Sequence, residues 1–190
     1  MRNQPQIKSS IPQAVQKVSV SMRRAGQIGL WVQIFLGVVS GLILGGAIVS
    51  QNVGANEGGG QEGFGIFLAI CGLVTLGVSI YFCLRYLNIG KLLMNADPAL
   101  RPSKADTIEV LRLGLIVNLV GMLLTLLGAE ATVGIILGKA LSQPQGLTTY
   151  DPERFVRALD IFVVQANINT IAAHFVGIVV SLLLINRVTR

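Results

Sequence analysis

The segment from Asp160 to Asn186 constrains the fold more than any other part of the chain. It carries no charged residue between its ends. Because an α-helix rises about 1.5 Å per residue, roughly 20 apolar residues span the hydrocarbon core of a bilayer, and the segment predicts a transmembrane helix. It also contains polar side chains, which are costly against lipid, so we expect each to face another helix or a wet cavity. They are Gln165, Asn167, Asn169, Thr170, His174 and Ser181.

The composition of the whole chain indicates an integral membrane protein. Of its 190 residues 52% are hydrophobic and only 13% are charged, and the mean hydropathy is +0.68. These values are too apolar for an ordinary soluble domain. The basic pI of about 9.8 does not indicate nucleic acid as a partner, because the lysines and arginines flank the apolar runs.

Three more apolar runs precede this segment. We expect spans at about residues 26–50, 64–84, 113–141 and 160–186, which predicts an all-α bundle of four transmembrane helices over residues 26–190. Residues 1–25 are basic and contain no acidic residue. Ile11, Val15 and Val18 recur there at helical spacing, so a short interfacial helix and a solvated tail both stay open.

The distribution of positive charge predicts the orientation. Four spans place five lysines and arginines of the N-terminal tail, five between the second and third spans, and Arg187 and Arg190 on one side. Only Lys139, Arg154 and Arg157 fall on the other side. The positive-inside rule therefore places both termini in the cytoplasm, or in the stroma of a plastid.

Two helix starts are indicated by local sequence. Ser103 followed by Asp106 is typical of a helix N-terminus leading into the third span, and Asp151 with Pro152 has the same character before the fourth.

Small residues recur at helical spacing and predict faces for close helix packing. Such faces would join the helices to one another, to a second copy of the chain, or to a larger membrane complex. The residues concerned are Gly37, Gly41, Gly45, Gly114, Gly121, Gly128, Gly134, Gly138, Ala173 and Gly177.

Nothing in the sequence indicates an enzyme or a resident cofactor. There is no nucleotide, haem or nucleophile motif. Cys71 and Cys83 lie twelve residues apart in one apolar run and indicate neither a disulfide framework nor a metal knuckle. A catalytic residue is therefore not expected.

Two stretches carry a family resemblance: LGAEATVGIILGKAL (127–141) and RALDIFVVQANINTIAAHFVGIVVSLLLINRVT (157–189). They resemble the small Tic-type inner-envelope proteins, also called permease in chloroplasts, and their cyanobacterial relatives. The resemblance implies four transmembrane helices and a plastid inner-envelope or cyanobacterial plasma or thylakoid membrane. It implies iron permeation or participation in protein import. The chain lacks the long Ser-rich transit peptide of plant members, which favours a cyanobacterial protein.

The polar residues of the spans have two interpretations. In one, Glu130, Gln165, Asn167, Asn169 and His174 form a polar track, and Glu130 and His174 contact a transported metal ion. In the other, the amides and the imidazole form hydrogen bonds that fix helix register. Iron sites in helical bundles usually gather several carboxylates and histidines, whereas this chain has one histidine. Both interpretations stay open at this stage.

Overall fold

The computed structural model describes residues 11–53, 60–141 and 158–189. Within these ranges the chain forms four long α-helices and one short 3₁₀ turn, and no strand. The expected all-α fold is confirmed, and each long helix contains a segment long and apolar enough to cross a membrane. The elements are α1 (Gln13–Val53), α2 (Gly60–Leu92), η1 (Pro98–Leu100), α3 (Lys104–Leu141) and α4 (Ala158–Thr189).

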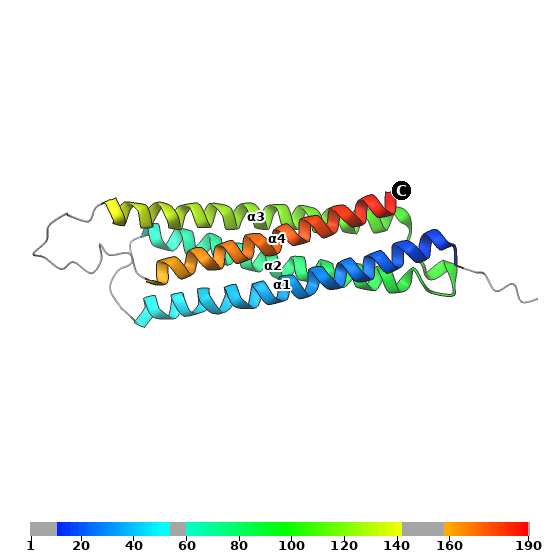
Figure 1. Cartoon of the computed structure of the whole chain (residues 1–190), viewed down its shortest axis with the longest axis horizontal. Coiled ribbons are helices and arrows are strands. Elements are labelled where there is room, and N and C mark those ends of the chain that lie inside the picture. The colour runs from blue at the N-terminus through cyan, green and yellow to red at the C-terminus, as the bar shows by residue number, and fades with distance from the viewer. Residues whose placement is uncertain (1–10, 54–59, 142–157, 190) are drawn as a thin grey trace, which may run out of the picture.

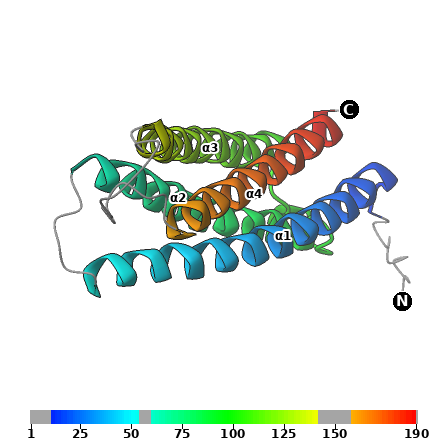
Figure 2. The same cartoon turned by 60° about the vertical axis from the view of Figure 1, so that its left-hand side comes forward.

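The four helices run lengthwise and alternate in direction (Figure 1). Helix α1 packs on α2 and α4, α3 packs on the same two helices, and α2 and α4 also touch across the bundle. The start of α1 and the end of α4 lie at the same end as the α2–α3 connection (Figure 2). We call this the terminal end of the bundle.

The helices are longer than the spans expected from sequence. Helix α1 has 41 residues, a length of about 60 Å, which is twice the hydrocarbon core of about 30 Å. Residues 13–24 form its first turns and continue without a break into the apolar part. The sequence left a separate interfacial helix or a solvated tail open for this stretch. Asp151 and Pro152, the helix start expected before the fourth span, lie outside the described residues.

The connection between α2 and α3 is capped by side chains. Asp97 accepts a hydrogen bond from the backbone N–H of Ala99 at 2.9 Å, and Ser103 Oγ accepts one from the N–H of Asp106 at 3.1 Å. A side-chain oxygen at this position satisfies a backbone donor that the helix itself leaves unpaired. The helix start predicted at Ser103 is confirmed.

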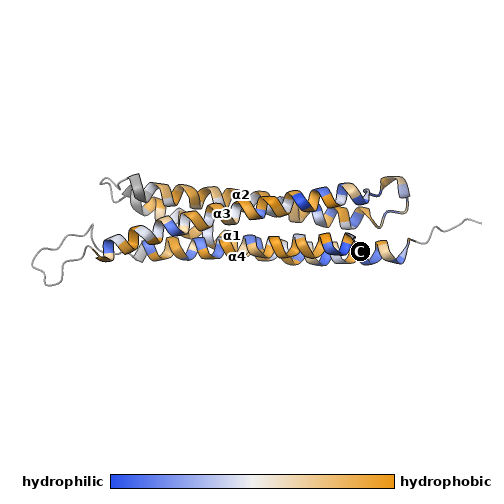
Figure 3. Ribbon diagram, turned by 90° about the horizontal axis from the view of Figure 1, so that it is seen from above, coloured by the Kyte–Doolittle hydropathy of each residue, from blue (hydrophilic) through white to orange (hydrophobic). Residues whose placement is uncertain are grey.

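Large apolar side chains cover the outside of the bundle, and hydrophobic residues predominate along its length (Figure 3). Trp31, Phe35 and Leu42 on α1 are examples. An apolar exterior of this extent would be a liability in water and suits a lipid environment. Inside, two apolar clusters are separated along the axis. Near the terminal end lie Met22, Tyr86, Ile89, Val110, Leu111, Val180 and Leu184; further along lie Leu44, Ala47, Ala69, Val163 and Ala166.

The small residues singled out in the sequence divide into two groups. A Cβ atom at Gly114, Gly121, Gly128 or Gly177 would meet a neighbouring helix, and one at Gly37 or Gly41 would touch Leu76 or Leu73. Ala173 is fully buried. A Cβ at Gly45, Gly134 or Gly138 would meet nothing within 4 Å. This second group packs against no described part of the chain.

Candidate functional site: a polar layer across the bundle

A layer of polar side chains crosses the bundle between the two apolar clusters, and every long helix contributes to it. The side chains come from all four helices and are fully buried, with exposed fractions of 0–2%. The residues are Gln33 of α1, Ser79 and Cys83 of α2, Asn118 of α3 and His174 of α4. We call this set the polar layer.

Asn118 is the centre of the hydrogen-bond network. Its Oδ1 accepts from Ser79 Oγ at 2.7 Å and from Gln33 Nε2 at 3.2 Å. His174 Nδ1 lies 3.2 Å from the same oxygen. The amide nitrogen of Asn118 donates within its own helix to the carbonyl of Gly114 at 2.8 Å. One side chain thus connects α3 to all three other helices.

Gln33 supplies the contribution of α1. Its Nε2 lies 2.8 Å from Ser79 Oγ and 3.2 Å from the Ala173 carbonyl, and its Oε1 lies 3.4 Å from Cys83 Sγ. Ser79 Oγ is within reach of both Gln33 Oε1, at 3.2 Å, and Asn118 Oδ1. Because a serine hydroxyl donates only one proton, these two oxygens compete for it.

His174 connects α4 to two helices at once. Its Nδ1 faces Asn118 Oδ1, and its Nε2 lies 3.2 Å from the backbone carbonyl of Gly72. Both neighbours are acceptors. A neutral imidazole carries a single N–H and can donate to only one of them at a time.

Two glycines create the space that the polar layer fills. A Cβ at Gly121 would overlap the His174 ring and lie 2.6 Å from Thr75 Oγ1, and one at Gly177 would overlap the amides of Asn118 and Gln33. Glycine at these positions therefore lets the helices approach closely enough for the amides and the imidazole to meet.

Buried polar side chains continue on both sides of the layer. Toward the terminal end, the hydroxyls of Tyr86 and Ser181 lie 3.1 Å apart. Away from it, Ser40 donates to the carbonyl of Ala166 at 3.0 Å. The buried set also includes Ser19, Thr107, Thr125, Asn167 and Thr170. Buried polar groups therefore recur along the interior from the terminal end to the level of Asn167 on α4.

The structure places the five residues of the predicted polar track differently. His174 and Asn167 are buried, Asn169 is half-buried, and Gln165 and Glu130 are exposed. Asn167 lies two turns from His174 on α4, and neither polar atom of its amide has a hydrogen-bond partner among the described residues. The structure therefore does not bring Glu130 and His174 together.

Each polar side chain of the fourth span was expected to face another helix or a wet cavity, and Gln165 faces no other helix among the described residues. Its Nε2 donates to Asn169 Oδ1 at 3.1 Å, one turn further along the same helix. Residues four apart on a helix are neighbours, so the two amides satisfy each other locally.

No resident metal site is formed by the part of the chain that the structure describes. It contains no group of three or more His, Cys, Asp or Glu side chains close enough to hold a metal ion. Cys83 and His174 are the metal-binding side-chain types in the polar layer, and two are fewer than a closed site needs.

A comparison with protein families places the chain. The model of the family described as "Protein of unknown function (DUF3611)" matches residues 12–189. The chain belongs to this family.

The DUF3611 chain is also similar to "Protein TIC 21, chloroplastic" of Arabidopsis thaliana. The two are 35% identical over 189 residues, which cover 95% of this chain and 61% of that relative. The chain thus spans less than two thirds of the relative's length. The similarity confirms the resemblance to the Tic-type proteins. No solved structure gives a significant match.

Most residues of the polar layer are not among the site residues predicted from the sequence. Gln33, Ser79 and Asn118 each stand within a charge-free run, where a polar residue indicates a partner inside the membrane. The axial register between the helices brings these three residues to the level of His174, and the sequence of one span does not reveal this register.

Proposed function

We propose that this protein is a permease for a metal cation, whose route follows the buried polar side chains and narrows at the polar layer. The observation that carries the proposal is the recurrence of buried polar groups along the bundle interior. Polar groups inside a membrane bundle are costly, and they characteristically mark pathways for ions or protons. The resemblance to the Tic-type permeases indicates iron as the substrate.

The chemistry of the polar layer suits passage better than storage. It offers the amide oxygens of Gln33 and Asn118, the imidazole of His174 and the thiol of Cys83. Imidazole and sulfur ligands suit first-row transition metals. Conduction requires binding that is strong enough for entry and weak enough for release, so a site without carboxylates is compatible with transit.

The position of His174 across the membrane supports a role for the polar layer as the constriction of the cation route. It lies 14 residues from Asp160 and 13 from Arg187, the charged residues that flank the apolar part of α4, or about 20 Å from each. The polar layer is therefore near the middle of the membrane. We place the protein in a cyanobacterial membrane or a plastid inner envelope, with both termini on the cytoplasmic or stromal side.

A second candidate function is that of a non-enzymatic subunit or assembly factor of a membrane complex, such as a protein-import translocon. It is favoured by the outer surface of α3. Glu130 is exposed there, and Gly134 and Gly138 follow on the same helix with open space at their Cβ positions. A carboxylate and small residues on an outward surface suit contact with another protein, including a second copy of the chain.

The deciding experiment is iron uptake into proteoliposomes that contain only this protein. We expect uptake by the wild type and strongly reduced uptake by His174→Gln, which keeps a polar side chain of similar size. Gln165→Leu is the matched control, because Gln165 is on the same helix but exposed. Absence of uptake by folded wild type would reject the permease and leave the assembly role. Uptake unaffected by His174→Gln would reject the polar layer as the route.

A further inference from the structure

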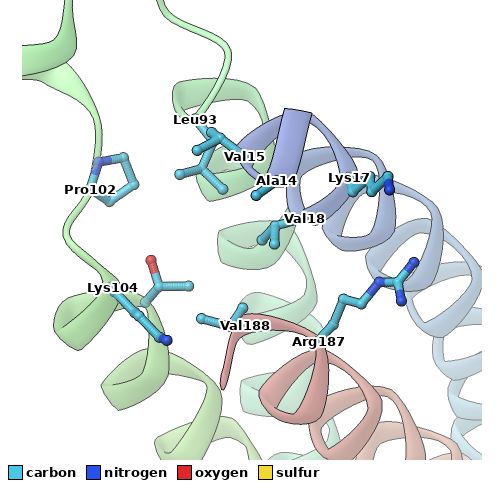
Figure 4. A pocket seen from close by; sticks show the side chains of 10 residues that line it. Ala14, Val15, Lys17, Val18, Leu93, Pro102, Lys104, Arg187 and Val188 are labelled. Carbon is cyan, nitrogen blue, oxygen red and sulfur yellow. The ribbon is translucent and has the colours of Figure 1, made fainter. Parts of the chain in front are cut away.

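A cavity of ≈ 490 Å³ opens at the terminal end, away from the polar layer. It lies between the start of α1, the segment that leads into α3, and the end of α4 (Figure 4). Its volume is within the range of small-molecule pockets, roughly 300–1,000 Å³. The cavity is therefore large enough to hold a ligand.

The walls of the cavity combine apolar and basic side chains. Val15, Val18, Leu93 and Val188 line it with hydrocarbon. Lys17, Lys104 and Arg187 come from three different helices and add positive charge, with Lys17 and Arg187 on one side of Val188 and Lys104 on the other (Figure 4). This combination suits an anion attached to an apolar tail.

The charge of the three cations is not paired within the described part of the chain. There, none of the three forms an ion pair with an acidic side chain. Lys104 Nζ has only a long contact, 3.5 Å, with the carbonyl of Thr189. Arg101 precedes the lining residue Pro102, and its buried Nη2 has no hydrogen-bond partner among the described residues. The positive charge is therefore available to a ligand.

The position along the bundle indicates where such a ligand comes from. Arg187 is the first charged residue after the apolar part of α4, so it marks the membrane boundary. Lys17 lies seven residues before Arg24 on α1, or about 10 Å further from the bilayer centre, whereas the headgroup region adds roughly 5–8 Å to each face of the hydrocarbon core. The backbone of Lys17 therefore lies just beyond the headgroups, and its long side chain can reach back to them. The cavity is thus at the outer edge of the headgroup region, where basic pockets between helices bind anionic lipids.

We infer that this cavity binds one anionic phospholipid, with its phosphate held between Lys17, Lys104 and Arg187 and an acyl chain leaving along the valine-lined wall. The inference does not depend on the proposed transport activity. The terminal end of the bundle would then have its own ligand. The basic side chains would recognise the charge of this lipid, and the valines would contact its acyl chain.

Native mass spectrometry of the full chain in a neutral detergent tests the inference, with dioleoyl phosphatidylglycerol and dioleoyl phosphatidylcholine as probes. We expect one phosphatidylglycerol per protein, held more tightly than phosphatidylcholine. A Lys or Arg near an anionic surface contributes about fivefold in affinity. Lys104→Gln combined with Arg187→Gln should therefore weaken phosphatidylglycerol binding about 25-fold.

The control pair is Arg24→Gln with Arg112→Gln, which removes the same charge from exposed residues that do not line the cavity. It should leave the affinity unchanged. Val188→Trp should block binding by filling the cavity while all the cations remain. Unchanged unfolding midpoints in detergent would show that the variants fold.

Three results would overturn the inference. Equal affinity for the two lipids would show that the cavity does not select an anionic headgroup. An equal loss of phosphatidylglycerol affinity in the control pair would show that only the general surface charge matters. Displacement of the lipid by millimolar inorganic phosphate would identify the ligand as a soluble phosphate.

Discussion

Asn118 Oδ1 and His174 Nδ1 lie 3.2 Å apart although 56 residues separate them in the sequence. The contact joins α3 to α4 at the level where Gln33 and Ser79 also reach Asn118. It fixes the axial register of two antiparallel helices, because a shift of one turn would move the partners about 5.4 Å apart. The polar layer therefore defines the level at which the four helices meet.

Asn118→Leu should destabilise the bundle more than any other single polar substitution in the layer. It removes the oxygen that faces Ser79, Gln33 and His174. Hydrogen bonds between membrane helices average about 0.6 kcal/mol each, so we expect a loss of about 2 kcal/mol in the free energy of unfolding. Titration of the detergent-solubilised protein with SDS measures it. Asn169→Leu, which loses one local bond to Gln165, should cost much less, and equal losses would contradict the central role of Asn118.

Gly177→Ala should also destabilise the protein, through steric overlap. The added methyl would overlap the amides of Asn118 and Gln33, and overpacking of this kind costs about 1–3 kcal/mol. Gly45→Ala is the matched control, because nothing lies within 4 Å of its Cβ position. The two variants can be compared in one SDS titration. A Gly177→Ala protein as stable as Gly45→Ala would show that the polar layer is not tightly packed.

Gly138→Leu tests the second candidate function. Because the Cβ position of Gly138 is open, the substitution should leave the stability of the monomer within about 0.5 kcal/mol of wild type. If α3 docks against another protein or another copy, the larger side chain should shift the assembly to a smaller species on native gels. Leu137→Ala, at an exposed neighbouring position, is the control for a change outside the glycine face. An unchanged assembly in Gly138→Leu would exclude this face as the contact.

The orientation of the bundle can be tested with cysteines introduced one at a time at Asn56 and Ala99. Four crossings place these positions on opposite sides of the membrane, with Ala99 on the side that carries most lysines and arginines. A membrane-impermeant maleimide should therefore label Asn56→Cys from outside intact cells and Ala99→Cys only after permeabilisation. The native Cys71 and Cys83 lie within α2 and serve as the background measurement. Labelling of both sites from one side would reject the topology.

The fold could be predicted from the sequence because each span contains a long charge-free run, and in lipid such a run must form a helix to satisfy its backbone. The helix ends were less predictable. Residues 13–24 have no apolar run, yet they continue α1 because the adjoining helix has already met the cost of nucleation. Ser103 was predictable because capping depends on only a few neighbouring residues.

The candidate site was predictable only in part. His174 is the one histidine of the chain and lies in an apolar run, so its importance was visible. Its partners depend on register and rotation among four helices, which no single span encodes. Glu130 illustrates the opposite case, because its charge drew attention while its rotation on α3 leaves it exposed.

The packing of α1 against α4 has a consequence for biosynthesis. Gln33 reaches the Ala173 carbonyl, and Ser40 reaches that of Ala166, so the first helix made depends on the last. Until α4 leaves the ribosome, the imidazole of His174 is absent and the amide of Asn118 lacks one of its partners. A nascent chain with three helices therefore presents unsatisfied polar groups within the bilayer, which are costly there. Truncated products should be recognised and degraded by membrane quality control, and only the complete chain should escape it.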